Sequence, residues 1–128
     1  MNTQNIVKSF VAASTITEFA VVTLDTAGKV AVATDATSDL IVGIAQRGAS
    51  AGDVVDVLVH GTSRAIAGAT LALTDTPRLA VTTAGAVKPG DTSGDYPVAR
   101  FLPNVNQLGA SSGEQVLVFF HGPIVPNA

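Results

Sequence analysis

The sequence contains no cysteine among its 128 residues, which excludes a disulfide framework and a thiolate metal site. Charged residues make up only 13% of the chain, and its seven basic residues are spread singly within a net charge of −3. Because there is no basic cluster and only one tyrosine to stack on a base, we expect no nucleic-acid binding. No apolar run is long enough to span a membrane, so we expect no membrane partner.

The apolar residues that are present are mostly small or β-branched. They form 47% of the sequence, while aromatic residues form only 5%. Alanine and valine favour thin, closely packed sheets over a large aromatic core, and a chain of this length fits one domain. The low charge has two readings that stay open: part of the surface is covered by a partner or by other subunits, or the small residues simply leave little room for charge.

One fourteen-residue segment occurs twice, at Gly48–Gly61 and Gly109–Gly122. Eight of the fourteen positions are identical. Each copy is predicted to form a glycine-containing turn, followed by an acidic residue and a β-strand that ends at a His-Gly pair. Weaker matches extend the repeat to residues 19–61 and 76–122. Two units are too few for a solenoid. We therefore predict an all-β fold, a small barrel or sandwich built from two duplicated β units.

Residues 1–17 precede the repeated units and form a predicted N-terminal arm, while residues 18–128 form a single β-rich domain. The spacing of Ile6, Phe10 and Ala13 fits a helix, and an extended arm fits equally well. Two roles stay open for the arm. It covers the chain's own core, or it docks on another subunit or another protein.

Within the domain, alternating apolar residues predict short strands separated by turns. Phe19–Leu24 and Lys29–Ala33 form a predicted hairpin around the turn Asp25–Gly28. Leu40–Ala45 is a predicted buried strand in which Gly43 marks a bulge or a close approach of another backbone.

No group of residues forms a convincing catalytic constellation. His60 and His121 occupy matched repeat positions, so packing of the two units can bring them together as metal ligands or as an acid–base pair, but no third ligand has suitable spacing. Ser63 lacks a nucleophile motif, and the acidic loops Asp35–Asp39 and Asp91–Asp95 lack the ligand count of a calcium-binding loop. We expect strand-end histidines and ordinary turns, with no enzymatic activity, metal or cofactor.

The segments Leu40–Gln46 and Gly48–Val57, followed by Gly61, resemble the capsid decoration (cement) proteins of tailed bacteriophages. Those proteins typically show a Val-Gly-Val-Ala strand, then a turn and strand of the type Gly-Ala-x-x-Gly-Asp/Glu-x-Val-x-Val, then a glycine. Here Ile44 replaces the second valine of the first strand. The resemblance covers roughly residues 18–74 and implies a non-enzymatic, β-rich protein that forms a homotrimer and binds the outer surface of a phage capsid.

By this resemblance the chain is a structural virion protein, made in the host cytoplasm, that stabilises a shell by bridging subunits of the major capsid protein. The alternatives are another virion component, such as a head fibre base or a tail-associated β-protein, and a small β-barrel ligand-binding module. We expect specificity where the two copies differ or stop, in the arm, the spacer 62–77 and the insertion Pro103–Gln107. The candidate capsid contacts are Asn2, Thr3, Ile6, Val7, Phe10 and Val11. The candidate subunit contacts are Arg64, Ile66, Leu71, Pro103 and Val105.

Overall fold

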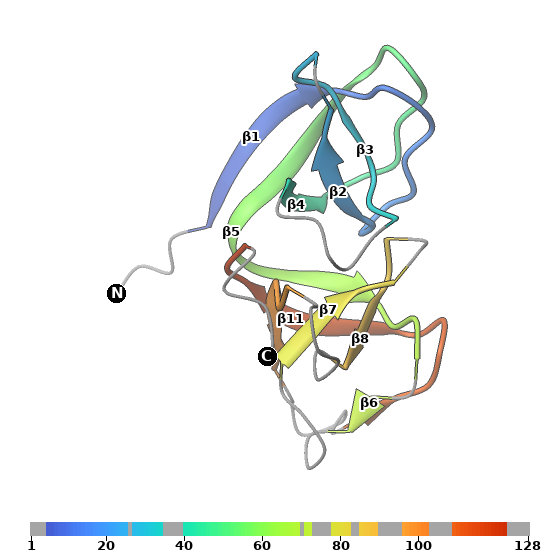
Figure 1. Cartoon of the computed structure of the whole chain (residues 1–128), viewed down its shortest axis with the longest axis vertical. Coiled ribbons are helices and arrows are strands. Elements are labelled where there is room, and N and C mark those ends of the chain that lie inside the picture. The colour runs from blue at the N-terminus through green and yellow to red at the C-terminus, as the bar shows by residue number, and fades with distance from the viewer. Residues whose placement is uncertain are drawn as a thin grey trace.

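The computed structural model describes residues 5–25, 27–34, 40–69, 71–72, 78–82, 85–89, 96–102 and 109–122. Every regular element within these residues is a β-strand, which confirms the predicted all-β class. The strands are β1 (Ile6–Val11), β2 (Val21–Leu24), β3 (Val30–Val32), β4 (Ile41–Ala45), β5 (Val54–Ile66), β6 (Leu71–Ala72), β7 (Arg78–Val81), β8 (Val87–Pro89), β9 (Ala99–Phe101), β10 (Gly109–Ala110) and β11 (Gln115–Phe120) (Figure 1).

Nine of the described strands form one antiparallel sheet that is strongly curled into a half-barrel. Its order is β3-β2-β4-β5-β11-β9-β7-β8, with β1 paired to β5 beside this path, and β6 pairs with β10 in a separate ribbon. Figure 1 shows two lobes through which the long strand β5 runs. We call residues 5–60 the first half and residues 61–122 the second half.

Strand β5 is thirteen residues long and pairs with different neighbours along its length. Its first part pairs with β1 and β4, and residues 61–66 pair with β11. The predicted strand exit at His60–Gly61 is therefore wrong, because the strand continues through it. Gly61 has a φ of 132°, and a Cβ at this position would collide with the side chain of Asn5. Glycine thus lets the strand bend where another residue would be strained.

The same main-chain hydrogen bonds recur in the two halves. The Ala12 N–H donates to the Asp53 carbonyl at 2.8 Å, and the Ala67 N–H donates to the Glu114 carbonyl at 2.8 Å. The two alanine carbonyls in turn accept from the glycines of the two matched turns, Gly52 and Gly113. Residues 61–66 therefore lie beside β11 in the same way that β1 lies beside the first part of β5.

The curl of each half is closed by a matched pair of contacts. Ala12 forms a parallel bridge to Val30 at the start of β3, and Ala67 forms a parallel bridge to Val87 at the start of β8. The N–H groups of the next residues donate to the same two valines, from Ala13 at 2.8 Å and from Gly68 at 2.7 Å. These correspondences begin at Val7, earlier in the chain than the sequence match at residue 19.

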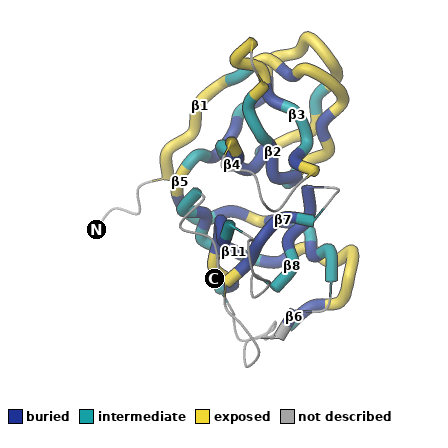
Figure 2. Tube along the Cα trace, viewed as in Figure 1, coloured by how far each residue is buried: buried dark blue, intermediate teal, exposed yellow. Residues whose placement is uncertain are grey.

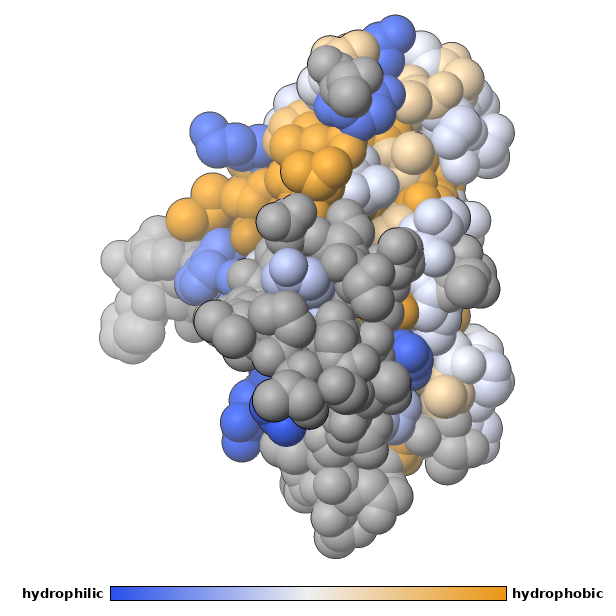
Figure 3. All heavy atoms as spheres, viewed as in Figure 1, coloured by the Kyte–Doolittle hydropathy of each residue, from blue (hydrophilic) through white to orange (hydrophobic). Residues whose placement is uncertain are grey.

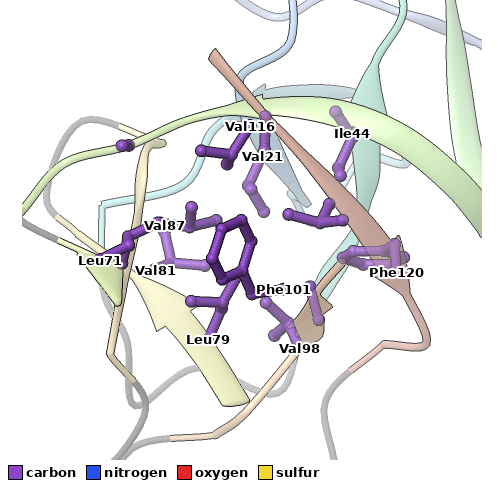
Figure 4. Packing of buried hydrophobic residues seen from close by; sticks show 14 of the residues in the cluster. Val21, Ile44, Leu71, Leu79, Val81, Val87, Val98, Phe101, Val116 and Phe120 are labelled. Carbon is purple, nitrogen blue, oxygen red and sulfur yellow. The ribbon is translucent and has the colours of Figure 1, made fainter. Parts of the chain in front are cut away.

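The core consists of two clusters. The smaller one lies inside the first half and includes Ala12, Val30, Val55 and Val57. The larger one fills the second half around Phe101 and also takes in residues of the first half such as Val21, Ile44 and Leu58 (Figure 4). Successive residues of β5 thus face different cores. Leu58 is only 1% exposed because it packs in the larger cluster, whereas Asp56 and His60 on the same face are half-buried and exposed.

The β4–β5 contact depends on Gly43, as the sequence predicted. A Cβ at this position would lie 2.5 Å from Val57 Cγ1 and would also collide with the Leu58 carbonyl. We expect Gly43→Ala to lower the free energy of unfolding by about 2 kcal/mol, measured by urea denaturation, because the two strands must separate. Gly48→Ala is the matched control, since the nearest atom to its Cβ would be the Ile16 carbonyl oxygen at 3.3 Å. Equal stability of the two variants would contradict the close approach of the strands.

Candidate functional site

Exposed apolar residues gather along β1. The large hydrophobic residues most exposed in the described part of the chain are Ile6, Val7, Val11, Leu40 and Val54. Three of these lie on β1 itself, and Val54 lies directly opposite Val11 on β5. Figure 2 shows β1 as exposed along nearly its whole length, and Figure 3 shows hydrophobic atoms gathering on the β1 side of the first half. This is the surface that a partner would desolvate most favourably.

The pairing register divides β1 into two faces. Val7 and Val11 lie on the outer face, at 49% and 37% exposure, and Val54 at 51% exposure extends this face onto β5. Between the two valines of β1, the Ser9 hydroxyl donates to Asp56 Oδ1 at 3.0 Å. We call Val7, Val11 and Val54 the outer valine face. The Phe10 side chain lies on the opposite face and packs against the first-half core.

One edge of β1 carries main-chain groups without a partner among the described residues. Ala12 N–H bonds to Asp53, so by antiparallel alternation Phe10 and Lys8 also direct their main-chain groups toward β5. The N–H and C=O groups of Val7, Ser9 and Val11 therefore point away from β5. The parallel bridge between Ala12 and Val30 makes the Val30 N–H the partner of the Val11 carbonyl, so β3 closes this edge at its Val11 end. Within the described residues, no strand pairs with the edge at Val7 and Ser9.

The corresponding edge of the second half is closed. The main-chain groups of Thr62 point away from β11, and the Asn5 side chain bonds to both of them. Asn5 Nδ2 donates to the Thr62 carbonyl at 3.3 Å, and the Thr62 N–H donates to Asn5 Oδ1 at 3.1 Å. The counterpart of Val54 is Gln115, a polar residue at the start of β11. The apolar, open version of this surface is thus particular to the first half.

The two histidines lie in ordinary packing contacts. His60 meets the Phe119 ring edge-on at a centroid distance of 5.2 Å, and His121 Nδ1 lies 2.7 Å from the Gly122 carbonyl. Ser63 accepts a hydrogen bond from Gln46 Nε2 at 3.0 Å and donates to the Arg64 carbonyl at 2.9 Å. Its hydroxyl therefore ties strand β5 to the end of β4.

The acidic residues of the repeated segments close turns. Asp53 Oδ2 accepts from the Ser50 N–H at 3.2 Å, and Glu114 Oε1 accepts from the Ser111 N–H at 2.7 Å. The part of the chain that the structure describes has no cluster of three or more His, Cys, Asp or Glu residues placed to hold a metal ion. The loops 35–39 and 91–95 lie outside the described residues. Within the described residues there is no helix long and apolar enough to cross a membrane.

The candidate contact residues fall in different environments. Of the arm residues, Ile6, Val7 and Val11 are exposed, Phe10 is half-buried, and Asn2 and Thr3 lie outside the described residues. Val54 was not predicted as a contact residue, although the sequence shows that glutamine replaces it in the second copy of the repeated segment.

The residues named for subunit contacts also differ in burial. Arg64 is exposed and Ile66 is half-buried on β5, whereas Leu71 is 3% exposed and packs in the larger core cluster. Pro103 and Val105 lie outside the described residues. Arg64 and Ile66 thus have surface available for a second subunit, while the Leu71 side chain already packs within its own chain.

The fold is similar to that of a phage protein. No protein-family model matches the chain, and neither does any curated protein sequence. Among solved structures, the chain is similar to the crystal structure of the head fiber gp8.5 N base in bacteriophage phi29, with a TM-score of 0.68 and 15% sequence identity. The alignment covers 95% of this chain and 99% of that chain. At this identity the likeness establishes a shared fold.

The closure of the second-half edge by Asn5 is directly testable. We expect Asn5→Leu to speed hydrogen exchange of the Thr62 amide at least tenfold, because the replacement cannot accept its hydrogen bond. The loss of stability should be about 1 kcal/mol. The Ala65 amide, which faces β11, is the internal control, and Ser9→Ala is the matched variant that leaves Thr62 protected. Unchanged exchange at Thr62 in Asn5→Leu would show that this edge is closed by something else.

Proposed function

We propose that the protein is a structural component of a phage virion that attaches to the outer surface of the capsid through the outer valine face. The observation that carries this proposal is the apolar, open surface along β1, on a fold similar to a head fibre base. The second half carries Thr62 and Gln115 at the places of Val7 and Val54. A difference of this kind between two otherwise matched surfaces favours a specific partner for the first half.

The chemistry of the outer valine face suits repeated attachment. Complete burial of a valine side chain is worth about 1.5 kcal/mol, so a few such residues add useful but modest affinity per copy after the cost of association is deducted. A shell offers the same site many times, and linked copies gain through effective concentration. The Ser9 hydroxyl donates to Asp56 Oδ1, so the Asp56 carboxylate keeps one hydrogen bond when a partner covers this face.

A head fibre base is supported more strongly than a decoration protein. The fold likeness spans nearly the whole chain, whereas the decoration-protein resemblance rests on short motifs of small residues. Both roles require attachment to the outside of the head, and neither requires catalysis. Imaging of labelled copies on virions separates them, since a decoration protein covers the head in hundreds of copies and a fibre base occupies the fibre attachment points.

Two finer features belong to the same proposal. We infer that the two halves arose by duplication, a view supported by the repeated segment and by the recurring hydrogen bonds of Ala12 and Ala67. We also retain the homotrimer that the sequence resemblance implies, with Arg64 and Ile66 as its candidate contacts. Threefold association uses the second half and leaves the outer valine face free for the capsid.

Shell attachment is tested with purified capsids that lack the protein. We expect the wild-type chain to co-sediment with them, and the double variant Val11→Lys/Val54→Lys to bind at least tenfold more weakly, because it would bury two charges in an apolar contact. Gln115→Lys is the matched control, since it places the same charge at the counterpart of Val54 and should bind normally.

The proposal fails if the wild-type chain neither binds capsids nor changes their thermal stability. Equal weakening by Gln115→Lys would instead show that binding responds to net charge, and the outer valine face would lose its assigned role. Circular dichroism of each variant checks that the fold persists, which we expect because all three positions are exposed.

A further inference from the structure

A row of three apolar residues joins the first half to the second. Val21 on β2 lies opposite Ile44 on β4, and Ile44 lies opposite Leu58 on β5. Since directly opposite residues on antiparallel strands share a face of the sheet, these side chains form one continuous row. All three are at most 1% exposed and belong to the larger core cluster, which also fills the second half. The first half thus uses this row to pack onto the second half.

The second half presents the equivalent row to solvent. Arg78 on β7 lies opposite Arg100 on β9, and Arg100 lies opposite Phe119 on β11. Both arginines are exposed and Phe119 is half-buried, with the ring of His60 edge-on to it at a centroid distance of 5.2 Å. We call Arg78, Arg100 and Phe119 the arginine row. Charged side chains at these positions do not suit an apolar core of the kind that receives the first-half row.

The arginine row concentrates positive charge that is dispersed in the sequence. Cβ atoms of directly opposite residues are about 5 Å apart, and like charges at such positions destabilise a sheet. Arg100 has no hydrogen-bond or ion-pair partner among the described residues. Arg64 is exposed on the same face, because it lies opposite Leu117, which alternates with Phe119 along β11. Three of the four arginines of the chain therefore lie on one face of the second half.

We propose that the arginine row binds an acidic segment of a second protein. Two carboxylates of that segment accept hydrogen bonds from Arg78 and Arg100, and an apolar side chain between them contacts Phe119. A guanidinium group donates two parallel hydrogen bonds to one carboxylate, so arginine fits this ligand in both charge and geometry. The negative charge of the segment also offsets the repulsion between the two opposed arginines.

A protein segment fits the arginine row better than a nucleic acid does. Nucleic-acid binding draws its affinity from many lysine and arginine contacts along a phosphate backbone. The arginine row offers two cations beside one aromatic ring, and the whole chain carries a net charge of −3, which repels a long polyanion. A pair of carboxylates beside an apolar residue matches this compact arrangement, in which arginine and an aromatic ring are typical anchors of protein interfaces.

The arginine row lies apart from the surfaces already assigned. The outer valine face belongs to β1 and the start of β5, whereas the arginine row crosses β7, β9 and β11. The candidate subunit contacts Arg64 and Ile66 lie opposite Leu117 and Gln115, nearer the start of β11 than Phe119. A chain attached to a shell through its first half can therefore hold an acidic protein with its second half.

A peptide-binding measurement tests the proposal. The probe is an acetylated and amidated pentapeptide of alternating glutamate and leucine, because alternate residues of an extended segment point to one side. In titrations followed by NMR, the largest shift changes should occur at the amides of Arg100 and Phe119. The matched peptide with glutamine in place of glutamate should bind at least tenfold more weakly, since it cannot form charge-assisted hydrogen bonds. Added salt should weaken binding of the acidic peptide.

A charge-matched pair of variants locates the binding site. We expect Arg100→Glu to bind the acidic peptide at least tenfold more weakly than the wild-type chain, because a carboxylate then faces the peptide. Lys29→Glu makes the same change of charge at an exposed position of the first half and should bind as the wild type does. Arg100→Glu places its new carboxylate opposite Arg78, so circular dichroism should show an intact fold.

Each outcome decides the proposal. It is overturned if the acidic peptide does not bind, if the glutamine peptide binds equally well, or if Lys29→Glu weakens binding as much as Arg100→Glu. It is also overturned if a single-stranded oligothymidylate binds more tightly than the acidic peptide, since the partner is then a nucleic acid. Peptide binding is measured without capsids, so failure of the chain to bind a shell leaves this proposal standing.

Discussion

Both halves of the molecule depend on the hydrogen-bond ladders of a single strand, β5. Its first part carries β1 and β4, and residues 61–66 carry β11, so β5 joins the strands of the two halves into one sheet. A strand shared in this way has to satisfy two cores at once. Val55 and Val57 face the first-half core, while Leu58 joins the larger cluster of the second half. Strict alternation of apolar and polar residues is therefore not required on β5, because both of its faces become buried in places.

This shared strand explains several small residues. Gly43 has no side chain because the β5 backbone passes too close for one, and Gly61 adopts a conformation in which a side chain would collide with Asn5. The acidic residue after each repeated turn has a local task as well, since Asp53 and Glu114 each accept a hydrogen bond from the turn backbone. These glycines and acidic residues thus serve the geometry of the sheet and of its turns.

The halves differ where the chain meets solvent. In the second half, Asn5 bonds to the outward groups of Thr62, and Gln115 stands at the exposed start of β11. In the first half, no strand among the described residues pairs with the edge at Val7 and Ser9, and Val54 is exposed. A monomer gains nothing from such an arrangement, because exposed valines and unpaired strand edges both favour association. The same asymmetry underlies the proposed attachment to a capsid through the outer valine face.

Much of the local structure followed from the sequence alone. The β class, the hairpin around Asp25–Gly28 and the close approach at Gly43 were predicted, because alternation, turn residues and glycine act over a few neighbouring positions. The structural role of Ile6–Val11 and the continuation of β5 past Gly61 were decided only by the tertiary structure. Both depend on pairing between segments about fifty residues apart, and local propensity carries no information about which distant strand is chosen. The exposure of the outer valine face was also decided by the tertiary structure. A sequence suggests a buried position for any valine, and only the fold determines which valines remain exposed.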